Sequence, residues 1–143
     1  MSETTQIHPD KVRAYLATYY RLGHTPQDIV LTIGKRSGRL AALFAGNGVH
    51  CGAFLTAYNP QGTIQSDAAN AQGHAELASK LQELGLQAIE GSGSEEGTDW
   101  PSEKSYFALG LTLEPAKAIG IHFDQDAIVW IGADAVPQLI LLR

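Results

Sequence analysis

The sequence predicts an α+β protein with two layers, in which helices cover a mixed sheet. From residue 53 onward, strand and helix patterns follow one another in the order strand, helix, strand, strand, helix, strand. This order matches a split βαβ or ferredoxin-like core. An N-terminal helix and a strand–helix unit precede it. We therefore expect a single domain over residues 1–143, with residues 1–7 as a disordered tail.

The composition is that of an ordinary soluble domain, with 143 residues, 44% hydrophobic and 17% charged, and a net charge of -5. The acidic balance argues against nucleic-acid binding, because phosphate neutralisation needs clustered Lys and Arg. Cys51 is the only cysteine, so we expect neither an internal disulfide nor a Cys-based zinc site. No apolar run reaches membrane length and no signal-peptide apolar region is present. We therefore expect no membrane partner and a cytoplasmic location.

The first third of the chain predicts a helix and then a strand–helix–strand unit. Apolar and aromatic residues recur with helical spacing over residues 8–22, and a β-branched run predicts a strand at 28–33. Ser37 is placed to cap a short helix over 38–45. The connections are short enough for a right-handed parallel crossover to a strand at 53–58.

The strand at 53–58 is the centre of the predicted sheet. Few of its residues favour solvent, so both of its faces should be covered. Pro60 ends the strand and should hold Asn59 extended, with the amide facing outward. An Asx-type turn former, with no functional role, explains Asn59 equally well.

A long helix is predicted from residue 66 to residue 85. Its apolar stripe of leucines continues backward to His74 and Asn70, so the core-facing side becomes polar in the first turns. A buried His and a buried Asn need hydrogen-bond partners, which either a structural network or a ligand could supply.

The last part of the chain predicts four strands, a helix and a flexible loop. The Gly- and Ser-rich loop at 91–99 is followed by Trp100, an aromatic residue in polar surroundings. The predicted elements are strands at 86–89, 105–111, 127–131 and 139–142, and a helix over 115–123.

A basic turn between the strand at 28–33 and the helix that follows could bind an anion. It carries Lys35 and Arg36 beside glycines, just before a helix N-terminus. The turn is neither a P-loop nor a dinucleotide fingerprint. A solvated turn with two exposed cations is the alternative.

Several polar positions share the pattern of a known family. They are the turn Thr56-Ala57-Tyr58-Asn59-Pro60, then Asn70, then Trp100 with Glu103 and Ser105, and the stretch from Gln125 through Asp126 to Trp130. In this pattern the sequence resembles a bacterial family catalogued only as a domain of unknown function, over about residues 19–130. Position 126 often differs from Asp in that family. The resemblance implies no activity.

The predicted topology sends the polar ends of these elements to one edge of the sheet. We therefore expect a site there, with Glu103 as the candidate catalytic residue. The expected ligand-binding residues are Lys35, Arg36, Thr56, Asn59, Asn70, His74, Trp100, Gln125 and Asp126. No metal site is predicted, because the carboxylates near His122 would share a face with it only in an extended chain.

Two functions compete for this site. The first is binding of, or catalysis on, a small polar, anionic or nucleotide-like metabolite, with Glu103 as general acid or base. The second is a non-catalytic interaction or regulatory module that uses the Trp100 loop as a protein-binding surface. The sequence identifies no cofactor, no substrate and no oligomeric state.

Overall fold

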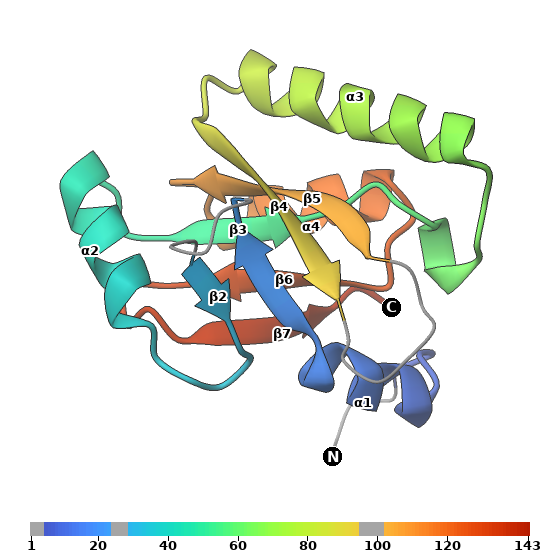
Figure 1. Ribbon diagram of the computed structural model, residues 1–143, viewed down its shortest axis with the longest axis horizontal. Helices are drawn as coiled ribbons and strands as arrows, with labels where there is room; N and C mark the ends of the chain where they lie inside the picture. The colour runs from blue at the N-terminus through green and yellow to red at the C-terminus, as the bar shows by residue number, and fades with distance from the viewer. Residues whose placement is uncertain (1–4, 24–28, 95–101) are drawn as a thin grey trace.

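The computed structural model describes residues 5–23, 29–94 and 102–143, which form helices on both sides of one sheet (Figure 1). In chain order the elements are α1 (Pro9–Ala17), β1 (Tyr19–Leu22), β2 (Ile29–Leu31), α2 (Gly38–Asn47), β3 (Gly52–Leu55), the 3-10 turn η1 (Pro60–Gly62), α3 (Asp67–Glu83), β4 (Ala88–Ser94), β5 (Glu103–Leu109), α4 (Leu113–His122), β6 (Ala127–Ile131) and β7 (Pro137–Leu141).

The sheet has seven strands in the order β2-β1-β4-β5-β3-β6-β7, and every neighbouring pair is antiparallel. It curls into a half-barrel. The α+β class is therefore confirmed. The predicted mixed sheet is wrong, because β2 pairs with β1 at the sheet edge and not with β3. The strands β4, β5, β3 and β6 do lie side by side, but in a larger curled sheet that is not clearly a ferredoxin-like core.

The two faces of the sheet carry separate apolar cores. On the convex face, α3 and α4 pack on the strands through residues such as Leu77 and Ile119. On the concave face, Phe54, Phe107 and Val129 point inward from the central strands. This alternation follows from the two-residue period of a strand, which sends successive side chains to opposite faces. Because of this alternation, β3 is covered on both faces, as the sequence predicts for the central strand.

The two ends of the half-barrel differ. At one end α2 inserts Leu40 and Phe44 into the concave core, and Ser37 caps the helix as the sequence predicts. The connection between β2 and α2 also meets the start of β7, through Gly34 N donating to Pro137 O (2.9 Å). At the other end lies α1, which has no fully buried residue (Figure 1). Apolar side chains of α2 therefore fill one end of the half-barrel, whereas α1 lies over the other end without filling it.

The predicted first helix is too long. The chain leaves α1 after Ala17 and becomes β1, in which exposed and buried residues alternate. Tyr20 and Leu22 join the concave core, and β1 pairs with both β2 and β4. Tertiary pairing therefore overrides the helical spacing of these residues. Ile7, at the end of the expected disordered tail, is buried.

The predicted flexible loop at 91–99 is partly wrong, since Gly91–Ser94 complete β4 and pair with β1 on one side and β5 on the other. Gly91 permits a close crossing, because a Cβ there would lie 2.2 Å from Arg21 O. Glycine inside a strand often marks a tight bend or a close backbone approach. Residues 95–99 and Trp100 lie outside the described residues.

Candidate functional site

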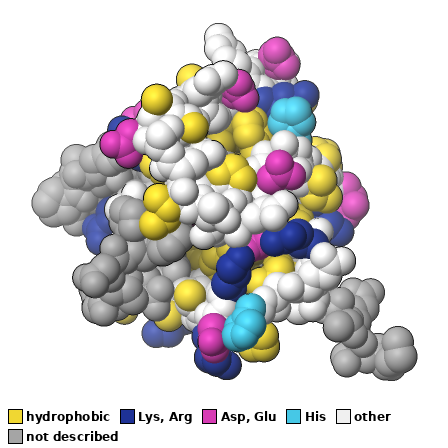
Figure 2. Space-filling model, turned by 90° about the vertical axis from the view of Figure 1, so that its right-hand side faces the viewer, with side chains coloured by type: hydrophobic (Ala, Val, Ile, Leu, Met, Phe, Trp, Pro, Cys, Tyr) yellow, Lys and Arg dark blue, Asp and Glu magenta, His cyan; other side chains and the backbone are white. Residues whose placement is uncertain are grey.

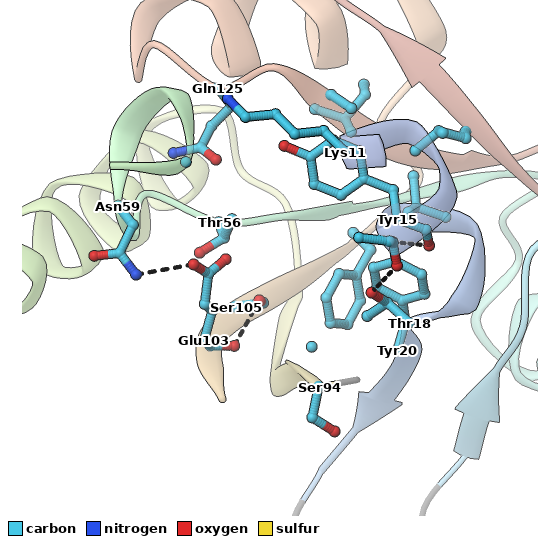
Figure 3. A pocket seen from close by; sticks show the side chains of 18 residues that line it. Lys11, Tyr15, Thr18, Tyr20, Thr56, Asn59, Ser94, Glu103, Ser105 and Gln125 are labelled. Carbon is cyan, nitrogen blue, oxygen red and sulfur yellow. Dashed lines mark hydrogen bonds between the residues drawn. The ribbon is translucent and has the colours of Figure 1, made fainter. Parts of the chain in front are cut away.

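A pocket lies beneath α1, at the covered end of the half-barrel (Figure 3). It encloses a cavity of about 260 Å³ between α1 and the concave face of the sheet. Its lining is Lys11, Ala14, Tyr15, Thr18, Tyr20, Phe54, Thr56, Asn59, Gly62, Gly93, Ser94, Glu103, Ser105, Gln125, Ala127, Ile128, Val129 and Leu139. Apolar side chains of the sheet form much of the wall, and polar side chains gather where β3, β5 and α1 meet.

Glu103, the first residue of β5, contributes a carboxylate to this lining. Asn59 Nδ2 donates a hydrogen bond to Glu103 Oε2 at 2.9 Å (Figure 3). The backbone O of Glu103 accepts a bond from Ser105 Oγ (3.2 Å). The predicted candidate catalytic residue is therefore in the pocket, and a buried amide orients its side chain.

Asn59 is fixed by hydrogen bonds at every polar group. Its backbone N donates to Asn70 Oδ1 (2.9 Å), and its Oδ1 accepts from Asn70 Nδ2 (3.0 Å) and from Gln65 N (3.1 Å). Gln65 Nε2 also donates to Asn70 Oδ1 (2.7 Å). Both asparagines are buried. A network in which every member is satisfied holds its side chains in one arrangement.

The backbone at Asn59 corrects a prediction. Pro60 was expected to keep Asn59 extended with an outward amide, but Asn59 is left-handed (φ 44°, ψ 65°) and its side chain is buried. Asparagine adopts this conformation more readily than most residues, and the hydrogen bonds to Asn70 and Gln65 offset its cost.

Two more non-glycine residues with positive φ lie beside Asn59. They are Gln61 (φ 56°) and Asp124 (φ 54°), and Gln61 N donates to Asp124 O at 2.8 Å. Lys11 Nζ, from α1, donates to Gln61 O at 2.8 Å. Uncommon backbone conformations cluster at ligand clamps and active sites, where the surrounding structure maintains them. Such a cluster at the rim supports a functional role for this end of the molecule.

Asp126 anchors α1 and does not line the pocket. Its side chain is fully buried, and its oxygens accept from Lys11 Nζ (3.1 Å), Tyr15 OH (3.3 Å) and Arg143 Nε (2.6 Å). Burial by itself raises the pKa of Asp126, but the hydrogen bonds and charges of Lys11 and Arg143 outweigh it and hold the pKa below its ordinary value. The structure therefore places Asp126 behind the site as a tether for the helix that covers it.

Thr56 and Gln125 complete the polar side of the lining. Thr56 Oγ1 donates to Lys104 O (2.8 Å) and accepts from Tyr58 N (3.1 Å). Gln125 Nε2 donates to Tyr58 O (3.1 Å), so it holds the segment that connects β3 to η1. Both residues are predicted members of the site, and both face the pocket.

Two tyrosines from α1 and β1 face these groups. Tyr20 OH donates to Tyr15 O (2.8 Å), and the Tyr20 ring meets Phe54 edge to face with centroids 5.3 Å apart. Burial raises the pKa of both tyrosines, and the charge of Glu103 adds to the effect on each. Both phenols therefore stay protonated at neutral pH and can only donate or accept hydrogen bonds.

Three predicted site residues lie elsewhere. Lys35 and Arg36 are exposed at the α2 end, so their predicted convergence with the site is wrong. His74 lies on the helix-covered face, where its ring stacks on Tyr106 (centroids 4.3 Å apart) and Nδ1 has no partner among the described residues. Burial lowers the pKa of His74. The parallel crossover that would have brought Lys35 and Arg36 to the site is absent from the described sheet.

The contribution of α1 was not predicted. Lys11 and Tyr15 of α1 and its C-cap Thr18 line the pocket, at positions four and three residues apart, which lie on one side of the helix. The spacing is visible in the sequence. It shows that these residues share one side of a helix, but not which part of the protein that side packs against. The glycines of β4 were a second signal, because Gly93 lines the cavity with no side chain to fill it.

The described residues contain no group of three His, Cys, Asp or Glu side chains arranged to hold a metal ion. Among the same residues, no helix combines the length and the apolar character needed to cross a membrane. Charges of both signs lie on the face shown in Figure 2, so neither sign dominates it.

Comparison with known proteins gives one match. A family model described as "Protein of unknown function (DUF3293)" matches residues 55–128, which is more than half of the chain. This segment runs from the end of β3 to β6 and includes Asn59, Asn70, Glu103 and Gln125. No curated protein and no solved structure matches the chain.

Proposed function

The chain belongs to the DUF3293 family of proteins of unknown function, and we propose that it binds a small organic molecule in the pocket beneath α1. The ligand has an apolar body that lies against Phe54 and Val129 and a polar group that meets Glu103. The observation that carries the proposal is the Asn59–Glu103 hydrogen bond, which fixes a carboxylate in the lining of a cavity with a largely apolar wall. Binding sites typically combine such a wall with a few fixed polar groups.

The size of the cavity limits the ligand. Pockets for drug-sized molecules measure about 300–1,000 Å³, and this cavity of about 260 Å³ lies just below that range. The expected anionic character of the ligand rested on Lys35 and Arg36, which lie at the other end of the half-barrel. We therefore retain a small metabolite and give up the anionic, nucleotide-like class.

One carboxylate does not define a reaction, so the proposal is for binding. Glu103 as general acid or base stays a prediction, and so does the interaction module, because Trp100 lies outside the described residues. The positive φ angles at Asn59 and Gln61 support a ligand site more than a hydrogen-bond network with a purely structural role, since folding alone does not require them.

The proposal is tested by filling the cavity. A Cβ added at Gly93 would make ordinary contacts, the nearest being Thr18 Cγ2 at 3.6 Å, so Gly93→Val should fold with its methyl groups in the pocket. Ser92→Val is the matched control, because successive residues of a strand point to opposite faces. A panel of small metabolites is screened against all three proteins by ligand-observed NMR, with melting curves as a check on folding.

We expect compounds that bind the wild type and Ser92→Val, and that lose binding to Gly93→Val. Equal binding to both variants would place the site elsewhere. A panel that is broad in charge and shape and yields no binder would count against a ligand-binding function.

A further inference from the structure

Resting on the proposed function, we propose that the ligand carries a hydrogen-bond donor at its polar end, such as a hydroxyl group, and that Gln125 Oε1 accepts from it. The first argument is the orientation of the Gln125 amide. Its Nε2 donates to Tyr58 O (3.1 Å) and to Phe123 O (3.4 Å). An amide oxygen in that place would be repelled by the two carbonyl oxygens. The amide is therefore fixed with its nitrogen toward the backbone and its oxygen on the opposite side.

The second argument is the surroundings of Gln125 Oε1. Gln125 is buried and lines the cavity, and none of the described residues donates a hydrogen bond to its Oε1. Among the same residues, the fully enclosed side-chain atom without a partner is His74 Nδ1, so Gln125 Oε1 is open to the cavity. In Figure 3 this oxygen lies on the side of Tyr15. Buried acceptors normally have a partner, and a ligand with a donor would supply one.

The third argument is how the hydroxyl groups of the lining use their hydrogens. A hydroxyl group has one hydrogen to donate and two lone pairs that accept. Five residues of the lining donate that hydrogen to a carbonyl or carboxylate of the protein. They are Tyr15, Thr18, Tyr20, Thr56 and Ser105. Toward a ligand these groups can only accept, as Gln125 Oε1 does.

A few donors remain in the lining. Lys11 Nζ and Asn59 Nδ2 each have one N–H more than their hydrogen bonds use, and Ser94 Oγ donates to none of the described residues. A ligand group that only accepts therefore still finds a partner. The lining as a whole favours a donor without excluding an acceptor, and we expect a preference of moderate size.

Two isomeric probes test the inference. They are 2-phenylethanol, whose oxygen can donate a hydrogen bond, and benzyl methyl ether, which has the same atoms and an oxygen that can only accept. The binding of each is measured by NMR titration. We expect the alcohol to bind at least about fivefold more tightly than the ether, because the ether leaves Gln125 Oε1 without a partner.

Gln125→Met tests whether Gln125 causes that preference. Methionine keeps the unbranched shape of the side chain and has no amide oxygen, so the two affinities should come within about twofold of each other. Loss of the bonds to Tyr58 and Phe123 could loosen the pocket, but this would weaken both probes alike and leave their ratio unchanged. The ratio therefore separates recognition from a purely structural role. Gln138→Met, the same change at an exposed residue of β7 outside the lining, should keep the wild-type ratio.

The outcomes separate this inference from the proposed function. Equal binding of the two probes, or a preference for the ether, would overturn the donor class and leave a ligand pocket in place if Gly93→Val abolishes that binding. A preference for the alcohol that persists in Gln125→Met would overturn the role of Gln125. Failure of the alcohol to bind would overturn the inference, and would overturn the proposed function as well only if the metabolite panel yields no binder.

Should Gln125→Met fail to fold, the side-chain NH₂ signal of Gln125 in the wild-type protein replaces it as the readout. A larger shift of this signal with the alcohol than with the ether would support the inference. Equal shifts with both probes would overturn it.

Discussion

The two ends of the half-barrel contain the same kind of element, a helix of nine or ten residues, and use it differently. At one end α2 buries Leu40 and Phe44 in the concave core and leaves little space. At the other, α1 has no fully buried residue and is tied to the body through Lys11, Tyr15 and the buried Asp126. A cavity remains beneath α1.

If the pocket beneath α1 binds a ligand as proposed, stability and function depend on opposite ends of one sheet. Apolar burial stabilises by roughly 25 cal/mol per Å², so the end that α2 fills should contribute far more to folding. Polar tethers contribute less in net terms, because the same groups would bind water in the unfolded chain. A helix held by polar tethers can cover a binding site without filling it. The α1 end is therefore the end where a ligand can add contacts that folding does not supply.

The largest expected effect comes from truncating one leucine at each end. Leu40→Ala should lower the free energy of unfolding by about 2–5 kcal/mol, because Leu40 is fully buried and leaves a cavity. Leu16→Ala is the matched change on α1, where Leu16 is 46% exposed, and should stay within about 0.5 kcal/mol. Urea unfolding measures both. Similar losses for the two variants would show that the ends do not differ in this way.

A smaller effect is expected from the tether of α1. Asp126→Asn removes the charge that pairs with Lys11 and Arg143, and should cost about 1–3 kcal/mol. The cost is moderate because both cations are partly exposed and can be rehydrated. Hydrogen exchange should show greater opening of α1 than of α2 in this variant. Equal opening of both helices would mean that Asp126 supports the whole fold and not the α1 end.

The same carboxylate predicts a pH dependence. The pKa of Asp126 is lower in the folded protein than its ordinary value of 3.8. The folded state therefore binds fewer protons than the unfolded state between these two values, and the stabilisation is present above pH 3.8 and is lost as the pH falls through the folded pKa. The difference in unfolding free energy between wild type and Asp126→Asn should shrink over that range. A difference that stays constant would contradict the ion pairs.

Helices were predicted better from the sequence than strand partners were. The limits of α3 follow from Ser66 as N-cap and from a leucine stripe, which are local signals. The partners of β1 and β4 depend on pairing across the chain, which no local pattern specifies. Composition alone made Gly91–Ser94 look like a loop, although two neighbouring strands satisfy its backbone.

The convergence of the polar residues in one pocket was predictable in part for a related reason. Asn59, Asn70, Glu103 and Gln125 lie at the ends of elements joined by short connections, so the order of those elements brings them together. Lys11 and Tyr15 come from a helix whose position depends on the curl of the sheet and on Asp126. The predicted convergence of Lys35 and Arg36 with the pocket failed because it required a parallel crossover, whereas β2 lies at the sheet edge. The missing information was long-range in both cases: the curl of the sheet for Lys11 and Tyr15, and the strand pairing for Lys35 and Arg36.

The smallest effect is expected from the predicted anion cradle at the closed end. Lys35 and Arg36 are exposed at the connection before α2, and neither lines the pocket. A Lys35→Ala, Arg36→Ala double variant should change the free energy of unfolding by less than about 0.5 kcal/mol, as exposed substitutions usually do. It should also leave unchanged the binding of any panel compound whose binding Gly93→Val abolishes, because the exposed charges are separated from the pocket by the apolar core and are screened by salt. NMR titration of such a compound into both proteins measures this, and a parallel phosphate titration tests the cradle itself. Weakened binding of the compound in the double variant would show that the two ends are coupled through the sheet, and the proposed separation of a folding end from a binding end would then fail.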